Sequence, residues 1–416
     1  MTRKKLKIAL ISAHSFLRPG GVKSHVLGLY REFKRRGLKT KIIVPRRSSK
    51  EYYGKDIILL GTSFPLPFAG SESDFCINLN PLKINKVLKK EKFDILHFHN
   101  FGVPSALQIL DRSQSLNILT FHGDLEGSKF FKRLPSLLRL FKGMAKGKID
   151  GLIGVAPLVL EFFEDFYGLK TIIPNGIDIK EFNSKNPKIE KFNDAKINIL
   201  FIGRIEKRKG LLYLLKAYKI LIKKFSNLRL IVVGKGDLEK ECKEWANENK
   251  LTEVYFEGEK SGKELPSYYA TCDIFVSPAI FGESFGIVLL EAMASGKPFV
   301  GFANRGYSQL MKRKPGEKFL AEPKDYKELA SKIEILIKDE NLRKKMGEWG
   351  REEAEKYSWP KIADQVLAFY EVCLRNKKRH KKQSLFDIDK IKKRVYNKLL
   401  LRKHLYKYKK RGQEKI

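Results

Sequence analysis

The sequence predicts an α/β protein built from two doubly wound βα domains, with a basic extension at its carboxyl end. Two observations support this prediction. Short β-branched runs alternate with longer helical patterns over most of the 416 residues, and the alternation lapses once, at residues 179–196, before it begins again. Strands that alternate with helices favour mostly parallel sheets covered on both faces. At roughly 100–200 residues per domain, the length accommodates two such domains.

The first βα series predicts an amino-terminal Rossmann-like domain over residues 1–178. The apolar run that follows Met1–Lys7 is too short for a signal peptide, so we interpret it as the first strand. The expected strands are Lys7–Ala13, Lys41–Val44, Asp94–Phe98, Ile118–Phe121, Gly151–Val155 and Lys170–Ile173. The expected helices are Val22–Arg36, Ser105–Asp111, Leu134–Ala145 and Leu158–Tyr167.

The second series predicts another Rossmann-like domain over residues 197–356, after a linker at 179–196 that is rich in Asn, Lys, Pro and Asp. A helix within residues 357–374 is expected to cross back to the first domain, and residues 375–416 form a basic tail. The expected strands are Ile197–Ile202, Leu228–Val233, Val254–Glu257, Ile274–Ser277 and Pro298–Phe302. The expected helices are Gly210–Lys224, Leu238–Asn249, Lys263–Tyr269, Phe285–Ser295, Lys327–Lys338, Asn341–Lys356 and Lys361–Leu374.

The composition excludes several classes of protein. Hydrophobic residues make up 43% and charged residues 31%, which is typical of a globular chain with ample core material. No uncharged apolar run approaches the about 18 residues of a transmembrane helix. The four cysteines lie far apart without a CxxC pair, which argues against a zinc site or a disulfide framework and favours a reducing cytoplasm.

The formal net charge is +37, and the tail Arg375–Ile416, with 18 basic and 3 acidic residues, supplies +15 of it. A surface of this charge attracts anions, namely nucleic acid, anionic lipid or phosphorylated small molecules. Charge alone does not choose among these three partners.

Two loops at predicted strand ends are candidates for binding phosphate. In the first, Gly20 and Gly21 precede a helix, so backbone amides can approach a ligand closely at the positive helix end. A tight strand–helix turn explains these glycines equally well. In the second, Arg204 offers a fork for two oxygens and Lys209 a point charge, a pair that suits a diphosphate. The alternative for this loop is a solvated basic turn.

Two carboxylates, Glu283 and Glu291, bracket a mostly apolar segment that begins a predicted helix. Eight residues of helix span about 12 Å, so the two carboxylates can hold different parts of an extended ligand. The backbone amides of Phe285, Gly286 and Ile287 lie near the expected helix start, where free N–H groups can bind a phosphate between the two carboxylates. The alternative interpretation is that the two glutamates bracket an ordinary amphipathic helix and bind no ligand.

Taken together, these loops resemble the retaining glycosyltransferases of family 4, which have the GT-B fold of two Rossmann-like domains facing across a cleft. The resemblance covers about Lys5 to Leu374. It is reinforced by Gly20–Val26 and Thr120–His122, which look most like the phosphatidylinositol mannosyltransferase branch. Further supporting stretches are Pro174–Asp178, Val233–Asp237 and Glu291–Pro298.

The resemblance implies a role for each motif residue. Gly20 and Gly21 approach the donor phosphates, whereas Arg204 and Lys209 bind the diphosphate. The remaining roles are that Glu283 faces the transferred sugar, Glu291 holds the ribose hydroxyls and His122 lines the acceptor side. The donor is a GDP- or UDP-sugar, left open between the two, with no other cofactor and no metal, because fixed cations stabilise the departing diphosphate.

Other histidines give weaker signals. His97 and His99 lie at i, i+2 on one face of a predicted strand. Such pairs can bind a metal, but no third ligand is nearby in sequence, so histidines that line the cleft or pack in the core are the preferred interpretation. His25 follows the glycine loop by one helical turn and is expected to pack there.

A basic segment, Lys129–Lys148, carries seven basic and no acidic residues among apolar ones. This pattern is typical of a helix that binds a membrane surface, and an ordinary surface helix is the alternative. The contact candidates are Lys129, Lys132, Arg133, Arg139 and Lys142. We therefore expect a hexosyltransferase, peripheral on the cytoplasmic face of the membrane, that acts on a lipid or glycan hydroxyl. A GT-B nucleotide-sugar epimerase and a basic nucleic-acid-binding protein are the alternatives.

Overall fold

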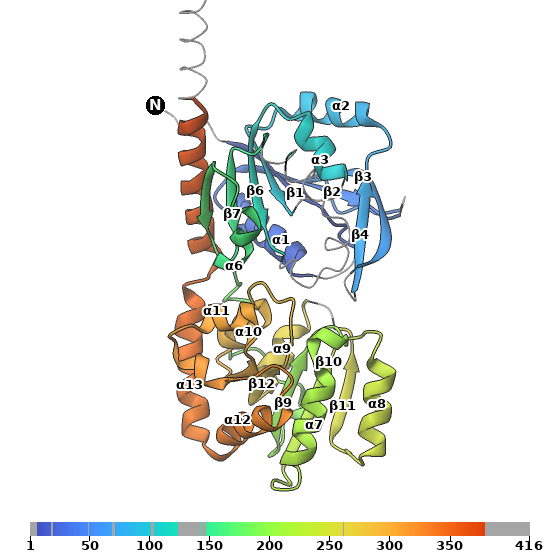
Figure 1. The fold of residues 1–416 in the computed structure, drawn as a ribbon, viewed down its shortest axis with the longest axis vertical. Coiled ribbons are helices and arrows are strands. Elements are labelled where there is room, and N and C mark those ends of the chain that lie inside the picture. The colour runs from blue at the N-terminus through green and yellow to red at the C-terminus, as the bar shows by residue number, and fades with distance from the viewer. Residues whose placement is uncertain are drawn as a thin grey trace, which may run out of the picture. The chain divides into compact units, whose positions relative to one another are not determined.

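The computed structural model contains two α/β domains, each with its own parallel sheet, and so confirms the predicted fold class (Figure 1). The structure describes residues 6–17, 20–48, 50–68, 71–100, 104–123, 143, 147–260 and 262–378. Both sheets lie within one compact unit, Met1–Leu367. The five predicted membrane-contact residues lie outside the described residues, and so does the expected helix Leu134–Ala145 apart from Gly143.

The first sheet has eight strands in the order β4-β3-β2-β1-β5-β6-β7-β8. All neighbouring strands pair in parallel except β3 and β4, which are antiparallel. The central strands β5 (Ile95–His99) and β6 (Leu116–Phe121) are buried along their length, as expected for strands covered on both faces. The strands are β1 (Lys7–Ser12), β2 (Lys39–Arg46), β3 (Ile57–Phe68), β4 (Ser71–Ile77), β5 (Ile95–His99), β6 (Leu116–Phe121), β7 (Gly151–Gly154) and β8 (Leu169–Ile172).

Helices connect these strands, and local chemistry marks where they begin. The side chain of Asn80 accepts a hydrogen bond from the Leu82 amide, and Pro81 occupies the first helical position of α2. The helices of this domain are α1 (Gly21–Arg35), α2 (Pro81–Glu91), α3 (Pro104–Asp111) and α6 (Pro157–Leu160), which continues into the 3-10 turn η1 (Glu161–Phe163).

The second sheet has six parallel strands in the order β11-β10-β9-β12-β13-β14. Its strands are β9 (Ile197–Ile202), β10 (Leu228–Val233), β11 (Val254–Gly258), β12 (Ile274–Ser277), β13 (Phe299–Phe302) and β14 (Leu320–Ala321). Its helices are α7 (Leu211–Leu221), α8 (Glu239–Glu248), α9 (Leu265–Thr271), α10 (Ile287–Ala294), α11 (Arg305–Met311), α12 (Tyr326–Lys338) and α13 (Glu340–Glu355). The 3-10 turns are η2 (Glu190–Phe192), η3 (Lys207–Lys209) and η4 (Pro315–Phe319).

The structure corrects several element predictions. The β3–β4 pair was not predicted, because β3 contains Pro65 and Pro67, and prolines argue against a strand unless it lies near a sheet edge. The helix α2 was not predicted either. The helix expected over Leu158–Tyr167 is reduced to α6 and one 3-10 turn. In the second domain, α11 and β14 were also missed, since both are short.

A final helix over residues 359–378 begins at Trp359, whose indole fills space left by two glycines. A Cβ atom added at Gly28 or at Gly176 would lie within 2.4 Å of the indole ring, so neither position accepts a side chain. Trp359 also meets the His25 ring edge-on, with 5.3 Å between ring centroids. The start of this helix therefore packs on residues of the first domain.

Cys76, Cys242, Cys272 and Cys373 are buried, and none of them forms a disulfide. Within the described part of the chain, no helix has both the length and the apolar character needed to cross a bilayer.

Candidate active site

The candidate residues lie at the carboxyl ends of strands next to the point in each sheet where strand order reverses. In the first sheet this point is between β1 and β5, and in the second it is between β9 and β12. Open α/β sheets bind ligands at such switch points because loops diverge there and leave room. The Gly20 loop follows β1, the Arg204 loop follows β9, and Glu283 follows β12.

The loop after β9 carries a chain of alternating charges. Arg204 Nη1 lies 2.7 Å from Glu206 Oε1, and Arg208 Nε donates to the other oxygen of Glu206 at 3.1 Å. Glu206 is only 7% exposed, whereas the Arg204 side chain is 49% exposed. The buried carboxylate thus anchors one edge of a guanidinium that still reaches solvent.

Glu283 joins this chain from the opposite loop. Its Oε1 accepts hydrogen bonds from Lys209 Nζ at 2.6 Å and from Arg208 Nη1 at 3.0 Å. Burial alone would raise the pKa of Glu283, but the two cations outweigh it and lower the pKa, so the carboxylate is ionised. Burial lowers the pKa of Lys209, and Glu283 opposes that shift. Removing one partner of such a buried pair costs about 3–5 kcal/mol, because the other charge stays buried.

The helix α10 starts after Gly286, not at Phe285 as predicted. Gly286 has φ of 105°, a left-handed value that favours glycine, and a Cβ atom there would come within 2.8 Å of the Tyr307 ring. Because residues 283–286 are not helical, Glu283 and Glu291 are not separated by eight helical residues. No side chain caps the N-cap position of α10.

The glycine loop and α10 meet. A Cβ atom added at Gly21 would lie 3.2 Å from Ile287 Cδ1, whereas one at Gly20 would meet nothing within 4 Å. Phe285 is buried and packs edge-on against Tyr357 at 5.9 Å between centroids. A side chain at 21 would therefore have to displace the tip of Ile287 by a few tenths of an ångström, whereas space remains beside 20.

Glu291 sits on α10 and accepts a hydrogen bond from the Tyr269 hydroxyl at 2.7 Å. Burial raises the pKa of Glu291 to about 7, with the Glu181 charge adding to the shift, while Tyr269 and Lys209 oppose it. This carboxyl group therefore changes its charge near neutral pH.

His122 follows β6 and is fixed by its main chain. Its amide donates to Asn100 Oδ1 at 2.8 Å, and its carbonyl accepts a hydrogen bond from the Ser284 hydroxyl. The second contact links His122 directly to the residue after Glu283. The His122 ring shares a hydrogen with His99, with 3.2 Å between His122 Nε2 and His99 Nδ1.

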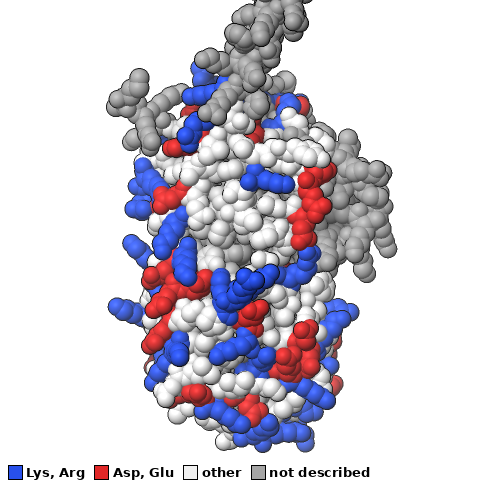
Figure 2. All heavy atoms as spheres, turned by 60° about the vertical axis from the view of Figure 1, so that its left-hand side comes forward, with Lys and Arg blue, Asp and Glu red and all other residues white. Residues whose placement is uncertain are grey.

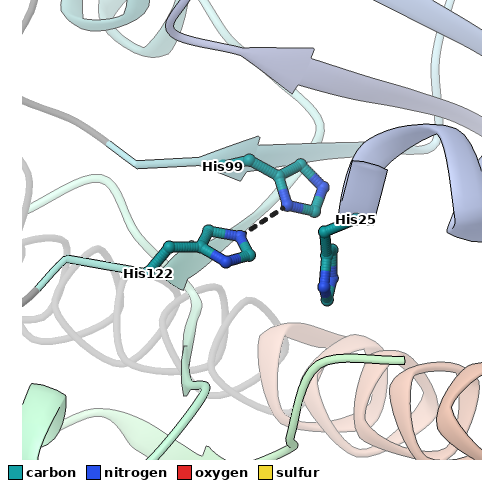
Figure 3. Close-up of side chains that lie close together, drawn as sticks. All are labelled: His25, His99 and His122. Atoms are coloured by element: carbon teal, nitrogen blue, oxygen red, sulfur yellow. Dashed lines mark hydrogen bonds between the residues drawn. The ribbon is translucent and has the colours of Figure 1, made fainter. Parts of the chain in front are cut away.

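A further histidine, His25, lies beside the His122 ring (Figure 3). His25, from α1, lies 4.7 Å from His122 between ring centroids, and its Nδ1 is 2.9 Å from Asn175 Oδ1. His97 and His99 do share one strand face, with centroids 4.3 Å apart, and His97 Nε2 bonds Thr120. Burial lowers the pKa of His25 to about 4 and holds the pKa of the other three well below the usual value. His25, His99 and His122 offer nitrogens within 4.8 Å of one another, a grouping able to hold a metal ion.

The structure thus brings together Lys209 with Glu283, Gly21 with Ile287, and His122 with Ser284. Sequence reasoning missed Arg208, Glu206 and Tyr269, which bind the predicted residues directly. Arg208 was visible in the basic run after β9, but nothing in the sequence showed that Tyr269 reaches α10 from another helix.

Two family matches agree with this arrangement. Residues 19–181 match the family described as Glycosyltransferase Family 4, and residues 182–353 match Glycosyl transferases group 1. The fold is that of a GT-B enzyme, and the chain is a glycosyltransferase with one of these two domains in each half.

Similar proteins cover nearly the whole chain. The phosphatidyl-myo-inositol mannosyltransferase of Mycobacterium leprae is 29% identical over 376 residues, which is 88% of this chain and 96% of that protein. The protein of that name from Mycolicibacterium smegmatis is 28% identical over 88% of this chain and 94% of its own. Among solved structures, the sucrose-phosphate synthase of Thermosynechococcus elongatus has a TM-score of 0.71 at 21% identity, covering 89% of this chain and all of that one. The Anabaena protein Alr3699/HepE, solved with UDP and glucose, has a TM-score of 0.69 at 19% identity, covering 88% and 99%. These two likenesses concern the fold.

Proposed function

We propose that this glycosyltransferase moves a hexose, with retention of anomeric configuration, from a nucleoside diphosphate sugar to a hydroxyl of a lipid or glycan. The observation that carries the proposal is the cationic cluster Arg204, Arg208 and Lys209 at the end of β9, tied to Glu283 at the end of β12. Fixed cations at this place suit a diphosphate leaving group.

Glycosyl transfer separates charge: the sugar becomes positive and the departing diphosphate negative. In the proposed mechanism Arg204 and Lys209 bind the diphosphate, and their fixed positions lower the barrier because they need no reorganisation during the reaction. Glu206 holds Arg204 and Arg208 in place. Glu283 faces the sugar whose charge develops, Glu291 accepts the ribose hydroxyls, and His122 lies on the acceptor side.

The names of two relatives indicate which donor and acceptor should be tested first. The Mycobacterium leprae and Mycolicibacterium smegmatis relatives are named for mannosyl transfer to phosphatidyl-myo-inositol. We therefore propose a mannosyl donor and a phosphoinositide-type lipid acceptor as the first pair to test, with UDP-hexoses as the competing donors.

The test is transfer by the full-length protein from GDP-mannose, UDP-glucose, UDP-GlcNAc and UDP-galactose to phosphatidylinositol and to simple glycan acceptors. Product NMR gives the anomeric configuration, which the proposal expects to match that of the donor. Inversion would contradict the retaining mechanism. Isomerised sugar without transfer would favour an epimerase instead, and salt-sensitive DNA binding without affinity for any nucleotide sugar would favour a nucleic-acid-binding protein.

We further propose that the enzyme works at the cytoplasmic face of a membrane. On the face drawn in Figure 2, basic and acidic side chains of the described residues are interspersed, so this face offers no uniform basic patch. The proposal therefore depends on Lys129–Lys148 and on Arg375–Ile416, which carry much of the excess charge in the sequence. Lys and Arg near an anionic bilayer contribute roughly 1 kcal/mol each.

Vesicle co-sedimentation of the full chain and of a chain ending at residue 374 tests this proposal. Binding to anionic vesicles should fall on truncation and weaken with salt, whereas nucleotide-sugar binding should be unchanged. Equal sedimentation of both proteins would remove the role of the tail, and no sedimentation of either would refute the membrane proposal.

A further inference from the structure

Three buried imidazoles from separate parts of the first domain converge on one point. His25 comes from α1, His99 ends β5, and His122 follows β6 (Figure 3). One ligand nitrogen from each lies within 4.8 Å of the other two. The three side chains are 2%, 0% and 9% exposed, so water does not hydrate them as it does surface histidines.

Within this cluster, two ring nitrogens have no hydrogen-bond partner. His25 Nδ1 bonds Asn175 Oδ1, an acceptor, so His25 carries its proton on Nδ1 and presents a bare lone pair at Nε2. His25 Nε2, the atom that we assign as a ligand below, is buried without a partner. His99 Nε2 is also buried without a partner, but it is not the His99 nitrogen that faces His122, which is Nδ1. Buried polar atoms are almost always satisfied, and those that are not point to a missing ligand or a functional role.

The spacing of the other two nitrogens suits a tetrahedral metal. His99 Nδ1 and His122 Nε2 are 3.2 Å apart. Two imidazoles bound to zinc at 2.0–2.1 Å in a tetrahedron place their nitrogens about 3.3 Å apart. His25 closes the third side by a rotation of its ring, since the ligand nitrogens of all three histidines already lie within 4.8 Å of one another.

We propose that His25, His99 and His122 form a binding site for one divalent transition metal of the zinc class. The donors are His25 Nε2, His99 Nδ1 and His122 Nε2, and a fourth position stays open for water or a hydroxyl. Three imidazoles without a carboxylate select zinc, cobalt, nickel or copper over magnesium and calcium. Asn175 is the outer group that fixes the His25 tautomer, as oxygen acceptors do for most metal-binding histidines.

Metal binding here releases no proton from the cluster. The hydrogen shared between His99 Nδ1 and His122 Nε2 moves to the other nitrogen of its ring, which leaves both lone pairs for the metal.

The site differs from the diphosphate cluster, so metal binding does not depend on the proposed function. One consequence does rest on that function. A metal would hold His122 away from the acceptor, so zinc should slow transfer at saturating donor.

The test is titration of the untagged full-length protein with Co²⁺, followed by competition with Zn²⁺. We expect one Co²⁺ per chain, with the intense visible absorption of four-coordinate cobalt, and its loss on adding one equivalent of Zn²⁺. His25→Ala and His99→Gln should each weaken binding about 100-fold or more, and Asn175→Ala about 10-fold. The matched control is His97→Gln, which alters a buried histidine on the same strand face that is outside the triad.

Thermal unfolding shows which variants fold. If a triad variant does not fold, X-ray absorption of the cobalt-loaded natural protein decides, since three imidazole ligands are expected. His380→Ala with His404→Ala removes the two histidines of the tail and should leave binding unchanged. The proposal is overturned if the folded protein binds no cobalt, if cobalt binds without imidazole ligands, or if His97→Gln weakens binding as much as His99→Gln. Any of these results would leave a purely hydrogen-bonded cluster that positions His122.

Discussion

Lys209 Nζ lies 2.6 Å from Glu283 Oε1, and this ion pair joins the loop after β9 to the loop before α10. Both side chains are largely buried, at 14% and 12% exposed. Each residue was predicted from sequence as part of a donor site, but their direct contact was not. The pair therefore couples the side chain that we propose to bind the diphosphate to the one that we propose to face the sugar.

Arg204→Ala and Lys209→Ala should each remove most transferase activity. Loss of one preorganised charge at the leaving group costs about 2–4 kcal/mol in the transition state, or roughly 30- to 1000-fold in kcat/KM. Lys207→Ala is the matched control, because Lys207 lies in the same 3-10 turn as Lys209 but is exposed. Near-normal kcat/KM for Arg204→Ala and Lys209→Ala, with folding checked by circular dichroism, would refute the assignment.

Replacing Glu291 and replacing Glu283 should change different kinetic constants. Glu291→Ala should mainly raise KM for the donor, since ribose contacts act in ground and transition states alike. Glu283→Ala should mainly lower kcat, since it removes the group next to the developing charge. It also leaves Arg208 and Lys209 without their buried partner, so thermal unfolding must accompany the kinetics. The reverse pattern would mean that the donor lies in the opposite direction along α10.

The sequence predicted the switch-point loops well because their signals are local. β9 and β12 end where predicted, and the glycines and cations that follow them are adjacent in the chain. Contacts between distant segments carry no such signal. Tyr269 reaches Glu291 from α9, and His25 reaches His122 across the first sheet, so the raised pKa of Glu291 and the histidine cluster emerge only from the fold.

The start of α10 illustrates a local error. Phe285 and Gly286 continue the apolar pattern of the helix, so periodicity includes them. The positive φ of Gly286 and the nearby Tyr307 ring delay the helix to Ile287. Glycine at this position is consistent with either a helix interior or a break, and only its neighbours decide.

Gly286→Ala should lower both stability and activity. A side chain at a left-handed φ costs about 1–2 kcal/mol, and here the Tyr307 ring must also move. Gly262→Ala is the control, because a Cβ atom at Gly262 meets nothing within 4 Å. Differential scanning calorimetry should show a lower Tm for Gly286→Ala alone, and equal Tm values would contradict the strained helix start.

Transferase activity should survive EDTA. Glu206 and Glu283 each bond two cationic side chains, which suits them to position Arg204, Arg208 and Lys209 and not to hold Mg²⁺ at the diphosphate. Initial rates before and after chelation and gel filtration measure this. Loss of activity that returns with added Mg²⁺ or Mn²⁺ would overturn the metal-independent mechanism.

The pKa of Glu291, raised to about 7, predicts that the proposed nucleotide site depends on pH. A carboxylate accepts hydrogen bonds from both ribose hydroxyls, whereas the protonated form accepts fewer, so donor affinity should rise between pH 6 and pH 8. Stability should change in the opposite direction. A raised pKa means that the folded state holds its proton more tightly, so this contribution is complete below the unfolded pKa near 4.5 and is lost as pH rises through about 7.

Glu291→Gln separates this effect from the titration of the nucleotide itself. The glutamine oxygen can still accept from Tyr269, but it does not ionise, so any remaining pH dependence belongs to the ligand. The ratio of wild-type to Glu291→Gln affinity, measured by calorimetry with UDP and GDP, should grow from pH 6 to pH 8. Over the same range the wild-type free energy of unfolding should fall relative to that of the variant. A ratio that stays constant would show that Glu291 does not bind the nucleotide through its ionised form.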